Sequence, residues 1–369
     1  MATTTTAVRG PLITAWSVVS PYGLESAQFA AGLSSGRTTA APLDQAIWSA
    51  PVDTACLVPD FSPAAVLGRK GTRSMDRVTG LAVTAVGQLL RDGDGERIAG
   101  VGEDAALVLG TNTGSAQSMM DFTRDSLVQE KPFFVDPMRF PNTVMNCAAG
   151  QCAIWHRLKG PNTTVAGGRA SGLLALNYAL RLRRSGRART VLCGAVEEFS
   201  AARAWLEVHT RRADEADSVL GEGAAVLLLE SAEDAAEHGR SGLAEVLALE
   251  FGVFHSDDQV ATVLADSVRR ALARSGVRVD EIALAADSQA HGVRGLGERA
   301  ALRDVLGDHC PERIACAEPI GDTHAASATF QTAALLTAAR AAGGMTGSVG
   351  LVTSVDRDGV VGCAVLRLG

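Results

Sequence analysis

Residues 163–184 read TTVAGGRASGLLALNYALRLRR, and this stretch decides which kind of fold the chain can adopt. Its start, Thr163–Val165, is β-branched and predicts a short strand. Its last part, Ser171–Arg184, spaces apolar residues at helical intervals and predicts a helix. The turn between them, Ala166–Arg169, has neither the Lys-Ser/Thr ending of a phosphate loop nor a GxGxxG fingerprint, so we exclude phosphate binding there. A strand that turns into a helix is the unit of an α/β fold.

The same alternation of strands and helices extends in both directions from this stretch. Several of the strands are apolar without interruption, which predicts a sheet that is covered on both faces. In the first part we expect strands at Pro11–Ser17, Ala105–Gly110, Thr190–Gly194 and Ala224–Glu230, and helices at Gly23–Leu33 and Asp76–Leu90. After a charged turn at Ser231–Ser241 we expect strands at Gly242–Leu249, Ile282–Asp287, Ser348–Ser354 and Val360–Arg367, and helices at Gln259–Ser275, Glu298–Leu306 and Ser327–Ala342.

The second part of the chain therefore repeats the strand and helix order of the first. The sequence predicts a duplicated α/β core with one half at residues 1–235 and the other at residues 236–369. No low-complexity linker separates the halves, so we expect them to pack as one body.

Composition and charge exclude several classes of partner. The chain has 369 residues, 47% hydrophobic and 20% charged, with a net charge of −7, which argues against binding nucleic acid or an anionic membrane. No apolar run reaches the ~18 residues that cross a bilayer, and residues 1–10 lack the apolar core of a signal peptide. The seven cysteines suit free thiols in a reducing compartment, so we expect a cytoplasmic protein. Cys310 and Cys316 lack a second pair at zinc spacing, so no metal site is expected.

Four segments, in order along the chain, together resemble the β-ketoacyl synthase family of the thiolase fold: Ile13–Gly23, Arg69–Asp76, Asn146–Gly172 and Gly221–Glu230. The third contains AAGQ-x-x-I-x-H-x-x-x-GP and is similar to one subfamily, the chain length factor, or β subunit, of type II polyketide ketosynthases. The resemblance implies a layered αβαβα fold and no cofactor. It also implies a heterodimer with a catalytic ketosynthase α subunit, which carries the polyketide chain received from an acyl carrier protein.

Catalytic members of the family use a cysteine nucleophile and two histidines, and this chain departs from that pattern. Arg169 stands where the cysteine belongs, and a guanidinium cannot act as a nucleophile. His291 matches the first histidine, whereas Asp322 replaces the second and Ala317 replaces an accompanying lysine. The C-terminal GFGG turn is also absent, because Val355–Gly359 reads VDRDG. We therefore expect no catalytic residues in this chain.

Two of these replacements suggest a compensating pair. In the family fold the two positions face each other, so we expect Arg169 and Asp322 to form a buried salt bridge, with Glu198 and Glu318 as alternative partners. We interpret His291 as a leftover polar group in a filled pocket rather than an active acid or base. A register shift that brings His324 into the place of the second histidine is the less favoured alternative.

The resemblance also assigns the surfaces that meet the α subunit. The helix after Asn112–Ser115 would form the far wall of the acyl tunnel, with bulk at Met120, Thr123 and Leu127 setting product length. The expected neighbours in the same channel are Met119, Phe122, Phe133, Phe134 and Met138, for which plain core packing is the alternative. The expected dimer-interface residues are Asn146, Asn162, Thr163, Thr164 and Val165.

The favoured function is thus a catalytically silent subunit that sets polyketide chain length. The compact loops of this chain favour reducing systems that build polyenes over aromatic pathways. One rival is a stand-alone condensing or malonyl-decarboxylating enzyme that uses His291 with an unusual nucleophile. Another is a homodimeric module that binds an acyl or carrier-protein partner without any role in elongation.

Overall fold

The computed structural model describes residues 10–91, 94–343 and 345–369. Residues 1–9, where the sequence predicts no signal peptide, lie outside the described residues. Within the described ranges no helix is long and apolar enough to cross a membrane.

The first part of the chain supplies five strands of the main sheet and most of the helices around it. Its main elements are β1 (Leu12–Val19), α1 (Ser26–Ser35), α4 (Arg77–Leu89), β4 (Ala106–Gly110), α5 (Ala116–Val128), α6 (Cys147–His156), β5 (Asn162–Val165), α7 (Ser171–Arg184), β6 (Val191–Glu197), α8 (Ala201–Thr210), β8 (Gly223–Glu230) and α9 (Ala232–Glu237). Smaller elements form a side sheet and two short helices: β2 (Ala41–Pro42), α2 (Gln45–Trp48), β3 (Thr54–Cys56), α3 (Pro63–Leu67) and β7 (Leu220–Gly221).

The second part supplies the other five strands of the sheet. Its elements are β9 (Ala244–Val253), α10 (Val260–Ser275), β10 (Ile282–Ala286), α11 (Gly292–Leu306), β11 (Glu312–Arg313), α12 (Ala317–Ile320), α13 (Ser327–Ala341), β12 (Val349–Val355) and β13 (Val360–Leu368).

The order of the strands shows the duplication directly. The ten-stranded sheet runs β11-β10-β12-β13-β9-β1-β8-β6-β4-β5. In the first half β4 pairs in parallel with β5 and β6, and β8 joins β6 and β1 antiparallel. In the second half β10 pairs in parallel with β11 and β12, and β13 joins β12 and β9 antiparallel. The halves meet where β1 pairs with β9, so the predicted duplication is confirmed. The division at residue 235 falls inside α9 and remains a proposal.

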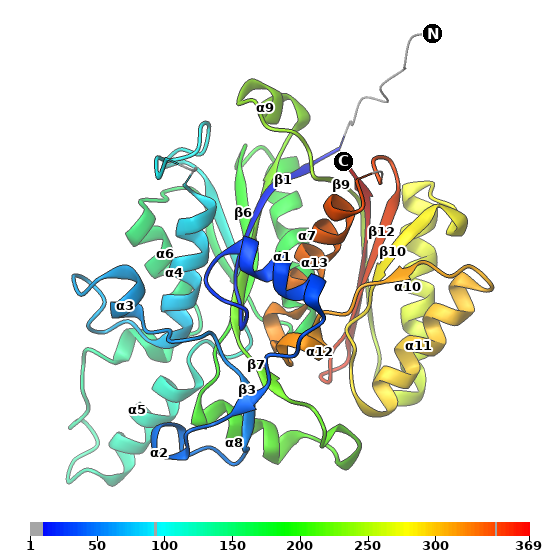
Figure 1. Cartoon of the computed structure of the whole chain (residues 1–369). Coiled ribbons are helices and arrows are strands. Elements are labelled where there is room, and N and C mark those ends of the chain that lie inside the picture. The colour runs from blue at the N-terminus through cyan, green and yellow to red at the C-terminus, as the bar shows by residue number, and fades with distance from the viewer. Residues whose placement is uncertain (1–9, 92–93, 344) are drawn as a thin grey trace.

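Helices form three layers around the two halves of the sheet (Figure 1). α7 packs against β4 and β6, α13 packs against β10 and β12, and the two helices contact each other in the middle of the molecule. α4 and α6 cover the outer face of the first half, and α10 and α11 cover the outer face of the second half. This is the αβαβα arrangement that the sequence predicts. In the central layer Leu173, Leu176 and Leu335 are almost fully buried.

Two of the local differences between prediction and structure have a clear physical reason. α11 begins at Gly292 rather than Glu298, although its first turns are rich in glycine. Tertiary contacts offset that poor propensity, because Asp214 accepts a hydrogen bond from Val293 N at 2.8 Å and Arg294 forms ion pairs with two acidic residues of neighbouring segments. The charged turn after β8 contains the short helix α9, which begins where Ser231 caps Asp234 N at 2.9 Å.

Candidate functional site

The centre of the candidate site is the turn between β5 and α7. A single 3-10 turn, Gly168–Ala170, leads into the first residue of α7. Gly168 has a φ of +55°, and a Cβ at this position would overlap the carboxyl group of Asp356. The close approach of Asp356 therefore requires glycine here. The turn places Arg169 at the N-terminus of α7, where its charge opposes the helix dipole.

Arg169 and Asp322 form a buried ion pair, as the sequence predicts. Arg169 Nη2 contacts Asp322 Oδ2, and Arg169 Nε donates to Asp322 Oδ1 at 3.3 Å. The two residues are only 7% and 9% exposed, so neither charge is well solvated by water. Burial alone disfavours both charged forms, but the guanidinium holds the pKa of Asp322 well below its usual range. The alternative partners, Glu198 and Glu318, do not contact Arg169 in the described structure.

The segment that carries Asp322 is attached to the first half of the molecule by a buried arginine. Arg203, near the start of α8, donates to the carbonyl oxygens of Asp322 at 2.9 Å, Glu198 at 2.8 Å and Gly221 at 2.7 Å. Asp322 Oδ1 also accepts from His324 N at 2.9 Å. The position of the carboxylate opposite Arg169 is therefore set by several hydrogen bonds as well as by the ion pair.

Asp356 is a site residue that the sequence reasoning missed. It is fully buried, and its Oδ1 accepts a hydrogen bond from Arg169 N at 2.7 Å, while its Oδ2 accepts from Asp358 N at 2.8 Å. A backbone N–H at the start of a helix is the kind of donor that stabilises an oxyanion in catalysis. Here an internal carboxylate already uses that donor. The signal was present in the VDRDG turn, which replaces the expected GFGG.

A cavity of about 380 Å³ lies beside the ion pair. It is lined by Arg169, Asp217, Val219, Ser288, Gln289, Ala290, His291, Ala317, Glu318, Gly321 and Asp322. His291 is exposed and stands at the N-cap of α11. The pocket beside His291 is therefore open rather than filled as expected, and the interpretation of His291 as a leftover polar group stays a prediction. The Ser288 hydroxyl donates to Glu298 at 2.5 Å, so it is already engaged.

His324 lies behind the ion pair rather than in the cavity. It is 2% exposed, with Nδ1 4.0 Å from Glu197 Oε2 and Nε2 3.9 Å from Glu207 Oε1. Burial, together with the charge of Arg169, holds its pKa well below the ordinary value, so it stays neutral. The register shift that would make His324 a catalytic histidine has no support in this placement.

A second buried group links the site to α5. Burial raises the pKa of Glu198 from its ordinary value of 4.5 to about 8, and the nearby charge of Asp76 adds to this effect. Glu198 Oε1 accepts from Ser115 Oγ at 3.1 Å, and Oε2 accepts from Val78 N at 3.1 Å. Ser115 is the N-cap of α5, so this carboxyl group positions the start of the proposed tunnel helix.

α5 exposes an apolar surface in the isolated chain. Ala116 is its single buried residue, whereas Met120 is 47% exposed and Leu127 is 78% exposed. Thr123, Phe133, Phe134 and Met138 are also exposed, and Met119 and Phe122 are half-buried. The alternative of plain core packing is therefore wrong for this segment. An exposed apolar surface of this kind is typical of a protein–protein or ligand contact.

The predicted interface strand lies at the edge of the sheet. β5 pairs with β4 on one side, and no strand in the described ranges pairs with its other side. Asn162 Nδ2 donates to Ala149 O of α6 at 2.9 Å, and Asn146 is exposed at the start of α6. Thr164 Oγ1 is buried without a hydrogen-bond partner among the described residues. α6 contacts both β5 and the 3-10 turn at Phe140–Thr143 that packs on α5, so the predicted tunnel and interface residues belong to connected segments.

Comparisons with known proteins agree on one family. The model for the N-terminal domain of β-ketoacyl synthases matches residues 12–235. A chain of the solved structure described as the ishigamide ketosynthase/chain length factor is 46% identical, with a TM-score of 0.92, and the match covers 97% of this chain and 99% of that chain.

Two curated relatives are more distant. A putative polyketide β-ketoacyl synthase 2 of Streptomyces halstedii is 28% identical over 358 residues, which is 90% of this chain and 85% of that protein. The 3-oxoacyl-acyl-carrier-protein synthase 2 of Synechocystis sp. (strain ATCC 27184 / PCC 6803 / Kazusa) is 27% identical over 330 residues, which is 81% of this chain and 77% of that protein.

Proposed function

Because the chain belongs to the β-ketoacyl synthase family, and within it to the ketosynthase/chain length factor group, we propose that it is the non-catalytic subunit of a type II polyketide ketosynthase heterodimer. Its partner is a cysteine-containing α subunit, which condenses malonyl units from an acyl carrier protein onto the growing chain. The observation that carries this proposal is the buried ion pair of Arg169 with Asp322, at the two positions where the family places a nucleophile and a histidine.

The proposed silence has two physical causes. A guanidinium stays protonated and offers no lone pair for attack on a thioester, so Arg169 cannot receive an acyl group. The backbone N–H of Arg169 is occupied by the carboxylate of Asp356, so an oxyanion formed there would meet a negative charge instead of a donor. Restoring only a cysteine at position 169 would therefore leave the site without a free oxyanion donor.

The proposed role in chain length depends on α5. Met120, Thr123 and Leu127 are spaced by three and four residues and therefore lie on one face of the helix. All three are exposed in the isolated chain, and the α subunit would cover them while its acyl chain extends toward them. A larger side chain on this face would shorten the space available, so that fewer two-carbon units fit. The short loops of this chain favour a reducing, polyene-forming pathway for that product.

The test is to co-purify the chain with its α subunit, add acyl carrier protein loaded with an acyl group, and measure the intact mass of each subunit. Cys310 is an exposed thiol and should first be changed to serine, so that non-specific acylation is not counted. We expect the acyl mass on the α subunit and none on this chain. Acylation of this chain, or malonyl decarboxylation by it in the absence of the α subunit, would contradict the proposal and favour a stand-alone enzyme.

A further inference from the structure

A separate cavity lies at the other edge of the sheet, far from β5. It has a volume of about 290 Å³ and is bordered by the C-terminal half of α11, the loop that follows α11, the end of β10 and β11. It is lined by Ala285, Asp287, Arg299, Leu302, Arg303, Leu306, Gly307, His309, Cys310, Pro311 and Arg313. None of these residues lines the cavity beside Arg169, so the two cavities are distinct.

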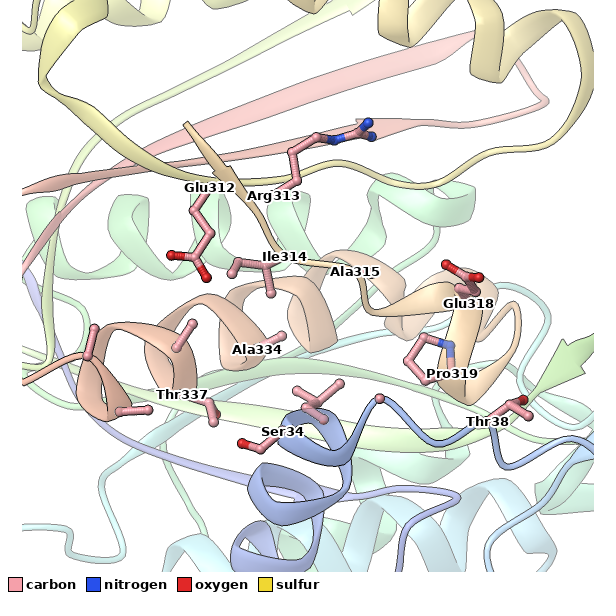
Figure 2. A pocket seen from close by; sticks show the side chains of 15 residues that line it. Ser34, Thr38, Glu312, Arg313, Ile314, Ala315, Glu318, Pro319, Ala334 and Thr337 are labelled. Atoms are coloured by element: carbon pink, nitrogen blue, oxygen red, sulfur yellow. The ribbon is translucent and has the colours of Figure 1, made fainter. Parts of the chain in front are cut away.

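β11 separates this cavity from a larger one beside α13. Figure 2 shows the larger cavity, and the side chains of Glu312 and Arg313 leave the strand in opposite directions there. Glu312 lines the larger cavity only, whereas Arg313 also reaches the smaller one. The acidic side chain next to Arg313 in sequence therefore does not add negative charge to the smaller cavity.

The charges in the smaller cavity are unbalanced. Arg299 and Arg303 lie one turn apart on α11, and Arg313 approaches from β11. Arg313 forms an ion pair with the buried carboxylate of Asp287. In the part of the chain that the structure describes, no carboxylate lies within 4.0 Å of Arg299 or Arg303, whereas Arg294 of the same helix forms ion pairs with Glu215 and Asp257. Two guanidinium groups at this cavity therefore lack a protein counter-charge.

The rest of the lining is apolar. Ala285 and Leu302 are almost fully buried at the base, and Leu306 and Pro311 complete this side. The His309 ring donates from Nε2 to Ile282 O at 2.6 Å, so it is fixed to the end of the sheet. The cavity thus offers a positively charged rim above an apolar base, and its volume suits a small molecule.

We propose that this cavity binds a phosphate monoester that carries a short apolar group. A phosphate monoester has a charge of about −1.5 to −2 at neutral pH, which matches the two unpaired guanidinium groups, whereas a carboxylate would neutralise one of them. Guanidinium groups donate paired hydrogen bonds that fit the oxygens of a phosphate. The apolar group would rest on Leu302 and Leu306, where its burial adds affinity.

The site is independent of the proposed subunit interface. β5, where the partner would pair, is one end of the ten-stranded order, and β11 is the other end. The cavity would therefore stay open in a heterodimer. Its ligand goes beyond the proposed role in chain length, and a binding test on the full chain does not depend on that role.

The test is calorimetric titration of the full chain with phenyl phosphate and with inorganic phosphate at constant ionic strength. The double variant Arg299→Gln with Arg303→Gln removes both unpaired charges. The matched control is Arg184→Gln with Arg187→Gln, which makes the same change in net charge at two exposed arginines elsewhere, one of them also in the last turn of a helix. All four side chains are at least partly exposed, and the thermal unfolding midpoint of each variant checks its folding.

We expect phenyl phosphate to bind about tenfold more tightly than inorganic phosphate, because the ring covers the apolar base. The Arg299 and Arg303 double variant should weaken binding by about tenfold or more, and the control should leave it unchanged. No binding of phenyl phosphate at millimolar concentration, an equal loss in both double variants, or equal affinity for the two ligands would overturn the proposal.

Cys310 provides a second readout of where the ligand binds. It is an exposed free thiol that lines the same cavity, so its rate of alkylation by iodoacetamide can be followed by mass spectrometry. Saturating phenyl phosphate should slow this alkylation several-fold in the unmodified chain and leave it unchanged in the Arg299 and Arg303 double variant. Alkylation at the same rate with and without bound phenyl phosphate would place the ligand elsewhere and overturn the proposal.

Discussion

Removing either partner of the Arg169–Asp322 ion pair should destabilise the chain strongly. Breaking a buried pair by removing one charge costs about 3–5 kcal/mol, because the other charge stays buried without its partner. The cost of Asp322→Asn in free energy of unfolding should be near the lower value, because the negative charges of Asp356 and Glu207 still act on Arg169. The cost of Arg169→Gln should be near the upper value, because it removes the positive charge that acts on both Asp322 and Asp356.

The double variant separates the ion pair from the loss of packing. When both residues are changed, no charge of the pair is left alone, so we expect a total cost smaller than the sum of the single costs by at least about 2 kcal/mol. The measurement is urea unfolding of the four chains at pH 7, with the free energy of unfolding extrapolated to water. A matched cycle on the exposed pair of Arg139 and Asp121, whose side chains are 52% and 35% exposed, should give a coupling of about 0–1 kcal/mol.

Acid titration gives an independent check on the same pair. The pKa of Asp322 is lowered in the folded chain, so its contribution to stability is present above the unfolded pKa of about 3.9 and is lost as the pH falls below it. The Asp322→Asn chain should lack this part of the acid destabilisation. Strictly additive single costs, with the same acid profile for Asp322→Asn and the unmodified chain, would refute the reasoning.

Three further predictions address the tunnel, the interface and the buried carboxyl group. Thr123→Trp, expressed with the α subunit, should shorten the polyketide by at least one two-carbon unit, whereas Gln129→Trp, at the exposed C-cap that follows α5, should not. Mass spectrometry of the products decides between them. Thr164→Pro should prevent heterodimer formation in size-exclusion chromatography without unfolding the chain. The carbonyl of Pro161 accepts a hydrogen bond from Leu107 N of β4, and the carbonyl of Val165 accepts one from Thr111 N just after β4, so by strand alternation the N–H of Thr164 points away from β4. Because the pKa of Glu198 is raised from 4.5 to about 8, the free energy of unfolding should fall as the pH rises through that range. Urea unfolding at pH 5 and pH 8 should show a smaller fall for Glu198→Gln, and an unchanged difference would count against the buried acid.

Local patterns in the sequence determined the fold class. The apolar runs at residues 105–110, 190–194 and 224–230 indicated strands buried on both faces, and each overlaps a strand that has a paired neighbour on both sides in the sheet. The replacement of the family's cysteine was also readable, because Arg169 stands at the start of α7 in a segment that resembles the family closely. These features depend on composition and spacing within a few residues, which a sequence displays directly.

Tertiary structure alone decided the contacts between distant segments. Arg169 and Asp322 are 153 residues apart, and although their pairing was predicted from the resemblance, the hydrogen bonds that hold Asp322 in place were not. Asp356, whose carboxylate accepts from the N–H of Arg169, is 187 residues away in sequence. The VDRDG turn shows that the expected GFGG turn is replaced, but it does not show which backbone group the new carboxylate meets. The exposure of α5 and the lack of a paired carboxylate at two arginines of α11 were also decided by the tertiary structure alone. Burial and charge balance depend on which distant segments the folded sheet brings together. The periodicity of residues along the chain does not specify these contacts.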